Sequence, residues 1–316
     1  MKIANLDVRK WWVPGLLLVI LGLLSTLTLY ASIYTVILII SIFMYIILTV
    51  SWTIFSAPTR YISLAPAAFF GIGIYTSATL GTELPLVLVI LIGALLSSFL
   101  ALLIGALTLR LRGIYFTVFT FGLVELIKNL LLWYEIKFTG TRGRFVILVD
   151  NNTIYHTMLI ILVVLLITAY LIRRSKYGLA LWSIGEFEDA AAHSGVNVNA
   201  LKTITFAISA SFMGATGAIM ATRWTYVDPY IAFNALYSFM VVLMAAFGGM
   251  GQLYGPVVGA AIFAYLEEVL ITKFPYHYML AFGLILLIVI LFIPDGLVGV
   301  IENWQEKRKG QQHANP

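Results

Sequence analysis

The sequence predicts an all-α integral membrane protein: a bundle of about ten transmembrane helices with both termini in the cytoplasm and one short helix in a cytoplasmic loop. Of its 316 residues, 61% are hydrophobic and only 10% are charged, whereas soluble domains are about half apolar and about a quarter charged. The mean hydropathy is +1.00. One span needs about 20 apolar residues, so residues 1–316 are expected to form a single transmembrane domain without a large soluble part.

Ten apolar segments bounded by charged residues, proline or glycine are the candidate spans. They cover residues 13–30, 33–55, 61–80, 84–109, 113–133, 155–172, 203–222, 235–249, 254–272 and 277–294. The stretch 57–66 contains Pro58, Arg60 and Pro66, so it is either a broken helix or a re-entrant loop. Non-helical backbone at membrane depth is tolerated only where it is buried in protein or lines a cavity.

The distribution of positive charge predicts the orientation of these spans in the cell membrane. With the N-terminus inside, 13 of the 19 Lys and Arg residues fall in cytoplasmic segments and five in external ones, while Lys128 lies within a span. Because cytoplasmic loops are enriched in Lys and Arg, both termini are expected inside, including the tail 301–316. Two connections are longer than turns: an external loop at 134–154 and a cytoplasmic loop at 173–202.

No motif of an enzyme site is present in the sequence. There is no cysteine, which excludes disulfides and thiolate metal sites. The P-loop motif, the H-E-x-x-H zinc motif and the G-x-S-x-G elbow are also missing. The four histidines lack metal-ligand spacing; they are His156, His193, His277 and His313. We therefore expect no catalytic residue, metal or bound cofactor on this chain, and we attribute its net charge of +5 to membrane orientation rather than to nucleic-acid binding.

The cytoplasmic loop contains the sequence pattern of a short helix. Ser183 and Glu186 have the S-x-x-E spacing of a capping box, in which the two residues satisfy free backbone donors at a helix start. Gly195 is a natural helix stop. These signals predict a helix over residues 184–194.

One face of this predicted helix is suited to contact with a partner. The i, i+3, i+7 spacing places Ile184, Phe187 and Ala191 on the same side, and such a narrow face suits docking in a groove. The alternative is an amphipathic helix lying on the membrane surface. Because Glu186, Glu188 and Asp189 would be repelled by anionic headgroups, we favour a protein partner.

Residues 188–195, with the sequence E-D-A-A-A-H-S-G, resemble a known motif. This segment is similar to the E-x-A-A sequence, followed four residues later by G, in the cytoplasmic loop of ABC importer permeases. Further segments, in the family's order, resemble the branched-chain amino acid permeases of the LivM type. They are 67–75, 109–117, 174–181, 195–197, 247–251, 255–256 and 294–299.

The resemblance implies a permease subunit, not an enzyme, in an ATP-driven importer of branched-chain amino acids. It also implies that the loop helix is a coupling helix, which docks on the ATPase through Glu188, Ala190, Ala191 and Gly195. The implied partners are a second related permease, two ABC ATPase subunits that use ATP and Mg²⁺, an extracytoplasmic solute-binding protein and the lipid bilayer. Other amino acids, short amides and urea are substrates of related permeases.

The sequence departs from this family just before residue 67. Where the family usually has G-Q-L-S-L-G-H, residues 60–66 read R-Y-I-S-L-A-P, so Tyr61 and Pro66 replace the usual glutamine and histidine. We expect this segment, with Tyr61 and Ser63, to help form the translocation path.

The fifth predicted span carries the remaining candidates for the path. Glu125 and Lys128 are neighbours on one helical face, and ionisable groups within a bilayer indicate function by default. They form either an internal ion pair or part of the substrate path. Thr117 and Thr120 bond either a passing solute or backbone carbonyls. If Glu125 and Lys128 served ion coupling, the protein would be a secondary transporter or channel that needs no ATPase, which is the alternative function.

Overall fold

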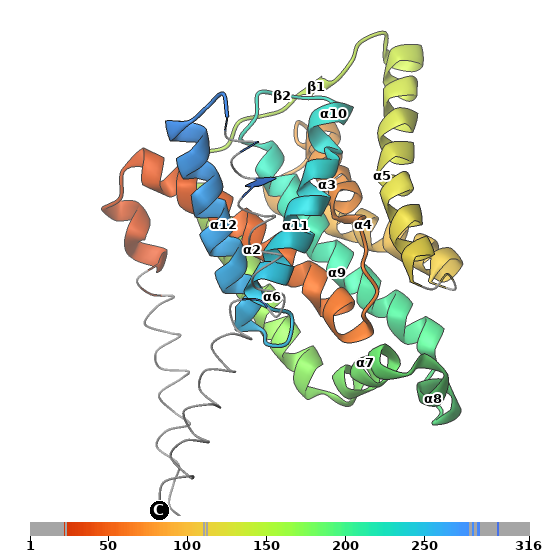
Figure 1. Cartoon of the computed structure of the whole chain (residues 1–316). Helices are drawn as coiled ribbons and strands as arrows, with labels where there is room; N and C mark the ends of the chain where they lie inside the picture. The colour runs from red at the N-terminus through yellow and green to blue at the C-terminus, as the bar shows by residue number, and fades with distance from the viewer. Residues whose placement is uncertain are drawn as a thin grey trace, which may run out of the picture.

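The computed structural model describes residues 24–109 and 113–277, together with the single residues 22, 111, 280, 283, 284 and 296. Within this part of the chain the elements in order (Figure 1) are η1 (Leu27–Leu29), α2 (Ile33–Thr59), α3 (Pro66–Leu80), α4 (Leu86–Thr108), α5 (Ile114–Tyr134), the π-helix η2 (Glu135–Thr139), β1 (Arg144–Phe145), α6 (Asn151–Arg174), α7 (Lys176–Glu186), α8 (Glu188–His193), α9 (Val198–Ala221), β2 (Tyr226–Val227), α10 (Pro229–Ala232), α11 (Ala235–Gly248) and α12 (Tyr254–Lys273). Most of the first and last predicted spans and the whole tail 301–316 lie outside the described residues.

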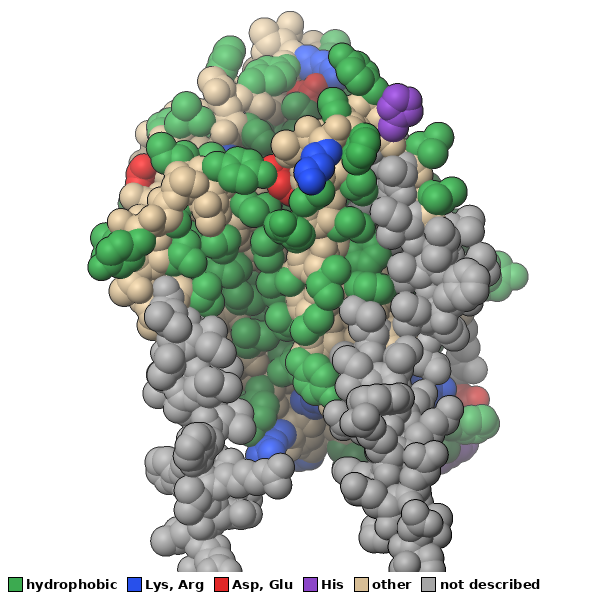
Figure 2. Space-filling model, turned by 60° about the vertical axis from the view of Figure 1, so that its left-hand side comes forward, with side chains coloured by type: hydrophobic (Ala, Val, Ile, Leu, Met, Phe, Trp, Pro, Cys, Tyr) green, Lys and Arg blue, Asp and Glu red, His purple; other side chains and the backbone are tan. Residues whose placement is uncertain are grey.

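The described part of the chain is almost entirely helical, and its only sheet consists of two strands of two residues each. Seven of its helical segments are long and apolar enough to cross a membrane. Figure 2 shows the surface expected of such a bundle: apolar side chains cover the visible flank, and charged ones gather toward its upper and lower parts. The chain is therefore a multi-pass membrane protein, since soluble proteins do not expose apolar surface over a whole flank.

The third predicted span, 61–80, is shorter in the structure than the sequence suggests. Helix α2 ends at Thr59, where Arg60 adopts a left-handed conformation with φ of 60°. Residues 60–65 are not helical, and α3 begins with Pro66 at its first turn. At 15 residues, α3 falls below the length of about 20 needed for a full span. The predicted interruption is thus present as non-helical backbone over residues 60–65, which we call the break.

Helices α3, α4 and α9 form the centre of the bundle and approach one another at glycines. A Cβ atom on Gly73 of α3 would overlap the carbonyl oxygen of Gly214 on α9. A Cβ on Gly214 would in turn overlap the carbonyl oxygen of Gly93 on α4. Small residues let membrane helices approach until their backbones touch. The three helices are therefore packed against each other with little space for adjustment.

The end of the bundle that is predicted to lie outside is closed by a small cap. Strands β1 and β2 pair antiparallel, with Arg144 opposite Val227, and Arg142 forms an ion pair of 2.5 Å with Asp228. The predicted loop 134–154 is shorter in the structure, because η2 extends helical structure to Thr139 and α6 already begins at Asn151. The cap joins the segment after α5 to the segment after α9.

Candidate functional site: the junction between the cytoplasmic loop and the break

The long loop 173–202 contains two helices in place of the single predicted one. Helix α7 begins after Ser175, whose hydroxyl accepts a hydrogen bond from the Gly178 N–H. Ser183 therefore lies inside α7 and does not cap a helix, so the predicted capping box and the helix 184–194 were wrong. The N-cap at Ser175 allows a longer helix to start upstream. Within that helix, the S-x-x-E sequence has no capping role.

Phe187 separates α7 from α8, and this changes which residues share a face. Its backbone is extended, with φ of −154° and ψ of 97°. Ile184 and Ala191 are buried together with Val198, whereas the Phe187 side chain is 67% exposed. The prediction that Phe187 lies on the same face as the other two was wrong, because the helix is interrupted at Phe187 itself. Ala190 is exposed, so it remains accessible to a partner.

The predicted helix stop at Gly195 is confirmed. Gly195 has φ of 89°, a conformation that side-chain-bearing residues rarely adopt. Its N–H donates to the Ala192 carbonyl at 3.0 Å, and the Val196 N–H donates to the Ala191 carbonyl at 3.1 Å. This pair of hydrogen bonds is a Schellman motif at the end of α8.

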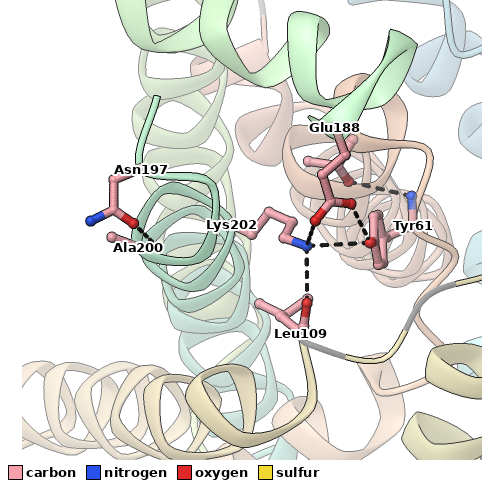
Figure 3. A network of polar contacts seen from close by, with 7 residues as sticks. Tyr61, Leu109, Glu188, Asn197, Ala200 and Lys202 are labelled. Carbon is pink, nitrogen blue, oxygen red and sulfur yellow. Dashed lines mark hydrogen bonds and ion pairs between the residues drawn. The ribbon is translucent and has the colours of Figure 1, made fainter. Parts of the chain in front are cut away.

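A buried network attaches α8 to the break (Figure 3). The Tyr61 hydroxyl donates to Glu188 Oε2 at 2.6 Å. Lys202, at the start of α9, donates from Nζ to Glu188 Oε1 at 2.9 Å, to the Leu109 carbonyl at 2.9 Å and to the Tyr61 hydroxyl at 3.2 Å. The break and the end of α4 thus meet the consecutive helices α8 and α9 at one ammonium group. We call these four residues the junction.

The junction satisfies the hydrogen-bonding needs of a fully buried cation. Lys202 is 0% exposed, and a buried charge is tolerated only when it is paired and hydrogen-bonded. Its three N–H donors have three acceptors, and the ammonium also lies 4.4 Å from the centre of the Tyr61 ring. Loss of Glu188 would leave this cation without a counter-charge. The junction is therefore a fixed link between the loop and the membrane helices.

A second contact beside the junction ties α7 to the break. Arg60 forms an ion pair with Glu186 at the end of α7, and the two side chains are 60% and 65% exposed. Exposed pairs of this kind contribute about 0–1 kcal/mol to stability. This ion pair therefore contributes little to the attachment of the loop. An open groove lies between the break and the loop helices, and its lining includes Arg60, Phe187 and Asp189.

The backbone of the break is hydrogen-bonded by side chains from α2 and α5. Thr117 donates to the Ile62 carbonyl at 2.8 Å, and Trp52 donates from Nε1 to the Ser63 carbonyl at 2.8 Å. The Leu64 N–H donates to the Thr120 hydroxyl at 2.9 Å. Backbone groups at membrane depth must be satisfied within the protein, and these side chains replace the missing helical hydrogen bonds.

The structure brings together most of the residues predicted for the path, but not all of them. Tyr61, Ser63, Thr117 and Thr120 gather at the break, where the two threonines bond backbone groups. Glu125 lies further along α5, where it pairs with Lys128 at 2.6 Å. The predicted ion pair is thus present, at a distance from the junction.

Sequence reasoning missed Lys202 and Trp52. In the sequence, Lys202 was counted only among the positive charges of a cytoplasmic loop. Two of its partners, Tyr61 and Leu109, come from distant segments. Trp52 is one apolar residue among many in its span. No local spacing in the sequence marks either residue.

Comparison with known proteins identifies the family of the chain. A family model described as "Branched-chain amino acid transport system / permease component" matches residues 34–291. The chain belongs to this family. The resemblance to LivM-type permeases of ABC importers is therefore confirmed. No solved structure matches the chain.

Individual members of the branched-chain amino acid permease family are distant relatives. The high-affinity branched-chain amino acid transport system permease protein LivM of Salmonella typhimurium strain LT2 is 25% identical over 84% of this chain and 70% of its own length. LivM of Escherichia coli strain K12 is 26% identical over 80% of this chain and 67% of its own length. The ribose import permease protein RbsC of Haemophilus influenzae is 27% identical over 41% of this chain and 42% of its own length. The similarity to LivM thus covers most of the chain, and that to the ribose permease covers less than half.

Proposed function

We propose that this chain is the permease subunit of an ATP-driven ABC importer in the cell membrane, where it forms the translocation path for a small polar solute. The observation that carries this function is the junction, in which Glu188 of the cytoplasmic loop is bonded to Tyr61 of the break and to Lys202 of α9. A partner that moves α8 must also move the break and the start of α9. The junction therefore offers a mechanical route from the cytoplasm to the membrane helices.

The partner at the loop is one of two ABC ATPase subunits, which bind and hydrolyse ATP with Mg²⁺. Ala190 and the exposed Phe187 ring offer a contact surface. An ATPase surface with a recess for an aromatic ring complements this region. Gly195 ends α8 and so fixes the length of the contacting helix.

The complete importer contains a second, related permease and an extracytoplasmic solute-binding protein. We favour a branched-chain amino acid as the solute, since the relatives named for these substrates align with most of the chain. Ribose and xylose permeases align with about 40% of it, so the shared part does not determine the solute. Binding of ATP and arrival of the loaded binding protein favour different states of one pathway, which is alternating access.

Uptake by the reconstituted complex tests this proposal. The permease pair, the ATPase subunits and the binding protein are incorporated into proteoliposomes, and uptake of radiolabelled L-leucine is followed with ATP on the cytoplasmic side. We expect uptake with ATP and none with a non-hydrolysable ATP analogue. Uptake driven by an ion gradient without ATP would support the secondary transporter and contradict the proposal.

A further inference from the structure

Helix α5 stands apart from the rest of the bundle. Of the candidate spans among the described residues it is the least buried, with 22% of its apolar window covered compared with 33% to 78% for the others. Figure 1 shows α5 at one edge of the molecule, away from α2, α6 and α12. One face, including Phe116 and Val124, is buried against the bundle, and the opposite face, including Val118 and Leu126, is exposed and apolar. The exposed face suits lipid.

A polar flank runs along α5 between these two faces. Thr117, Phe121, Glu125 and Lys128 follow one another at spacings of three and four residues, and all four are partly exposed. The side chains of Glu125 and Lys128 are 39% and 15% exposed. Glu125 lies about 16 Å from the start of α5 at 1.5 Å per residue, which is near the middle of a helix of 21 residues. The flank therefore places an ion pair near the membrane midplane.

Contact with lipid does not account for this ion pair. Ionised groups at the bilayer centre are costly, and they face the interior of a bundle or a water-filled cavity. The neighbours of the flank are aromatic side chains from α10 and α11. Phe121 lies 5.7 Å from the Phe239 ring, and the Lys128 ammonium lies 5.5 Å from the Tyr230 ring. Phe239 and Tyr230 are themselves 42% and 47% exposed. The flank thus combines two opposite charges with exposed aromatic surface.

We propose that the polar flank of α5 lines the translocation path and that Glu125 and Lys128 form a transit site for a zwitterionic solute. The ammonium group of the solute pairs with Glu125 and its carboxylate with Lys128, while Phe121 and Phe239 contact an apolar side chain. This inference rests on the proposed function and assigns the residues of the path that contact the solute.

The ion pair between Glu125 and Lys128 lowers the affinity of such a site for the solute, and transport requires a low affinity. Binding a zwitterion replaces one ion pair within the protein by two between protein and solute, and the Glu125–Lys128 contact of 2.6 Å must open. Transport needs binding that is strong enough for entry and weak enough for release. A site that closes on itself after the solute leaves also keeps charges paired in the empty path.

Cysteine accessibility tests whether the flank faces water. The chain contains no cysteine, so single cysteines can replace Phe121 and Asn129, which follows Glu125 by four residues and bonds its carbonyl. Leu126→Cys is the lipid-facing control and Val124→Cys is the buried control. The assembled importer in nanodiscs is treated with a small charged thiosulfonate. We expect labelling at positions 121 and 129 at least ten-fold faster than at 124 and 126. Equal rates at all four positions would overturn the inference.

Charge variants test the zwitterion site. Glu125→Gln and Lys128→Met are compared with the reversed pair Glu125→Lys with Lys128→Glu, which retains an internal ion pair. In proteoliposomes we expect all three to reduce the maximal rate of L-leucine uptake at least five-fold, with unchanged affinity of the binding protein. Full uptake by the reversed pair would assign the two residues a structural role and overturn the proposal.

Two further measurements separate failure of this inference from failure of the proposed function. A variant that does not assemble, as judged by size-exclusion chromatography, is replaced by the cysteine series, which leaves both charges in place. If the wild-type complex shows no ATP-driven uptake, the proposed function fails. If it transports but its flank is unreactive, only the transit site fails.

Discussion

The hydroxyl of Tyr61 donates a hydrogen bond to the Glu188 carboxylate, although the two residues lie 127 positions apart in the sequence. The bond joins a loop predicted to lie in the cytoplasm to a non-helical segment between two membrane helices. Lys202 holds both residues through its own hydrogen bonds. Disturbing any of the three residues should affect loop and break together.

Glu188→Gln should destabilise the junction. The buried Lys202 would lose its counter-charge, and breaking a buried pair costs about 3–5 kcal/mol. We expect a lower melting temperature and a loss of coupling between ATP hydrolysis and uptake. The matched control is Glu186→Gln, whose partner Arg60 is exposed, so that its effect should stay below about 1 kcal/mol. Equal effects of the two variants would argue against the junction.

Tyr61→Phe should weaken the junction without removing the ring that covers Lys202. The lost hydroxyl leaves part of the hydrogen-bonding capacity of Glu188 and Lys202 unused, at a cost of about 1–3 kcal/mol. We expect a several-fold lower ratio of solute transported to ATP hydrolysed. Tyr177→Phe, in the exposed first turn of α7, is the control and should behave as wild type. An unchanged ratio for Tyr61→Phe would mean that the hydroxyl does not contribute to coupling.

Thr120→Val should destabilise the break. The Leu64 N–H would lose its acceptor, and an unsatisfied buried backbone group costs about 1–3 kcal/mol. Thr168→Val is the matched control, because the Thr168 hydroxyl bonds only the Val164 carbonyl of its own helix. Thermal unfolding of the purified permease measures both. If the two variants have the same melting temperature, Thr120 does not support the break.

Ala190→Glu should prevent association with the ATPase while leaving the permease folded. Ala190 is exposed, whereas Ala191 is buried within the loop, so Ala191→Glu should lower the melting temperature instead. Co-purification with the ATPase subunits and thermal unfolding distinguish the two effects. Full ATP-driven uptake by Ala190→Glu would show that this face of α8 is not the contact.

The predicted orientation can be tested with cysteines at two exposed positions. Thr141 lies in the cap and Asn199 lies at the start of α9. An impermeant maleimide added to intact cells should label Thr141→Cys and leave Asn199→Cys unlabelled until the membrane is opened. Labelling of both from outside would contradict the ten-span topology.

The membrane helices were predictable because apolar length is a local signal. Seven predicted spans coincide with helices to within a few residues, and Pro58 and Pro66 marked the interruption between α2 and α3 correctly. The extent of the break was not predictable, because its hydrogen bonds come from Trp52, Thr117 and Thr120 on other helices.

The loop shows why local motifs can mislead. Ser183 and Glu186 have the spacing of a capping box, but the helix had already begun at Lys176, since Ser175 provides the cap. Gly195 was predicted correctly because its requirement for a positive φ is local. Lys202 depends on contacts across more than 90 positions, to Leu109 and Tyr61, and the sequence contains no sign of them.

The hydrogen bonds of the break have a consequence for movement. A helix that shifts along its neighbours keeps its own backbone bonds, but it cannot bend without losing some of them. Residues 60–65 carry no such internal ladder, because threonine hydroxyls and an indole supply their partners. Trp52 and Thr120 are themselves buried, so the backbone of residues 60–65 can change its conformation only if these side chains on α2 and α5 move with it. Ser209 of α9 also donates to the Ser51 carbonyl of α2 at 2.6 Å. A movement of the break is therefore coupled to α2, α5 and the block of α3, α4 and α9 that meets at Gly73, Gly93 and Gly214.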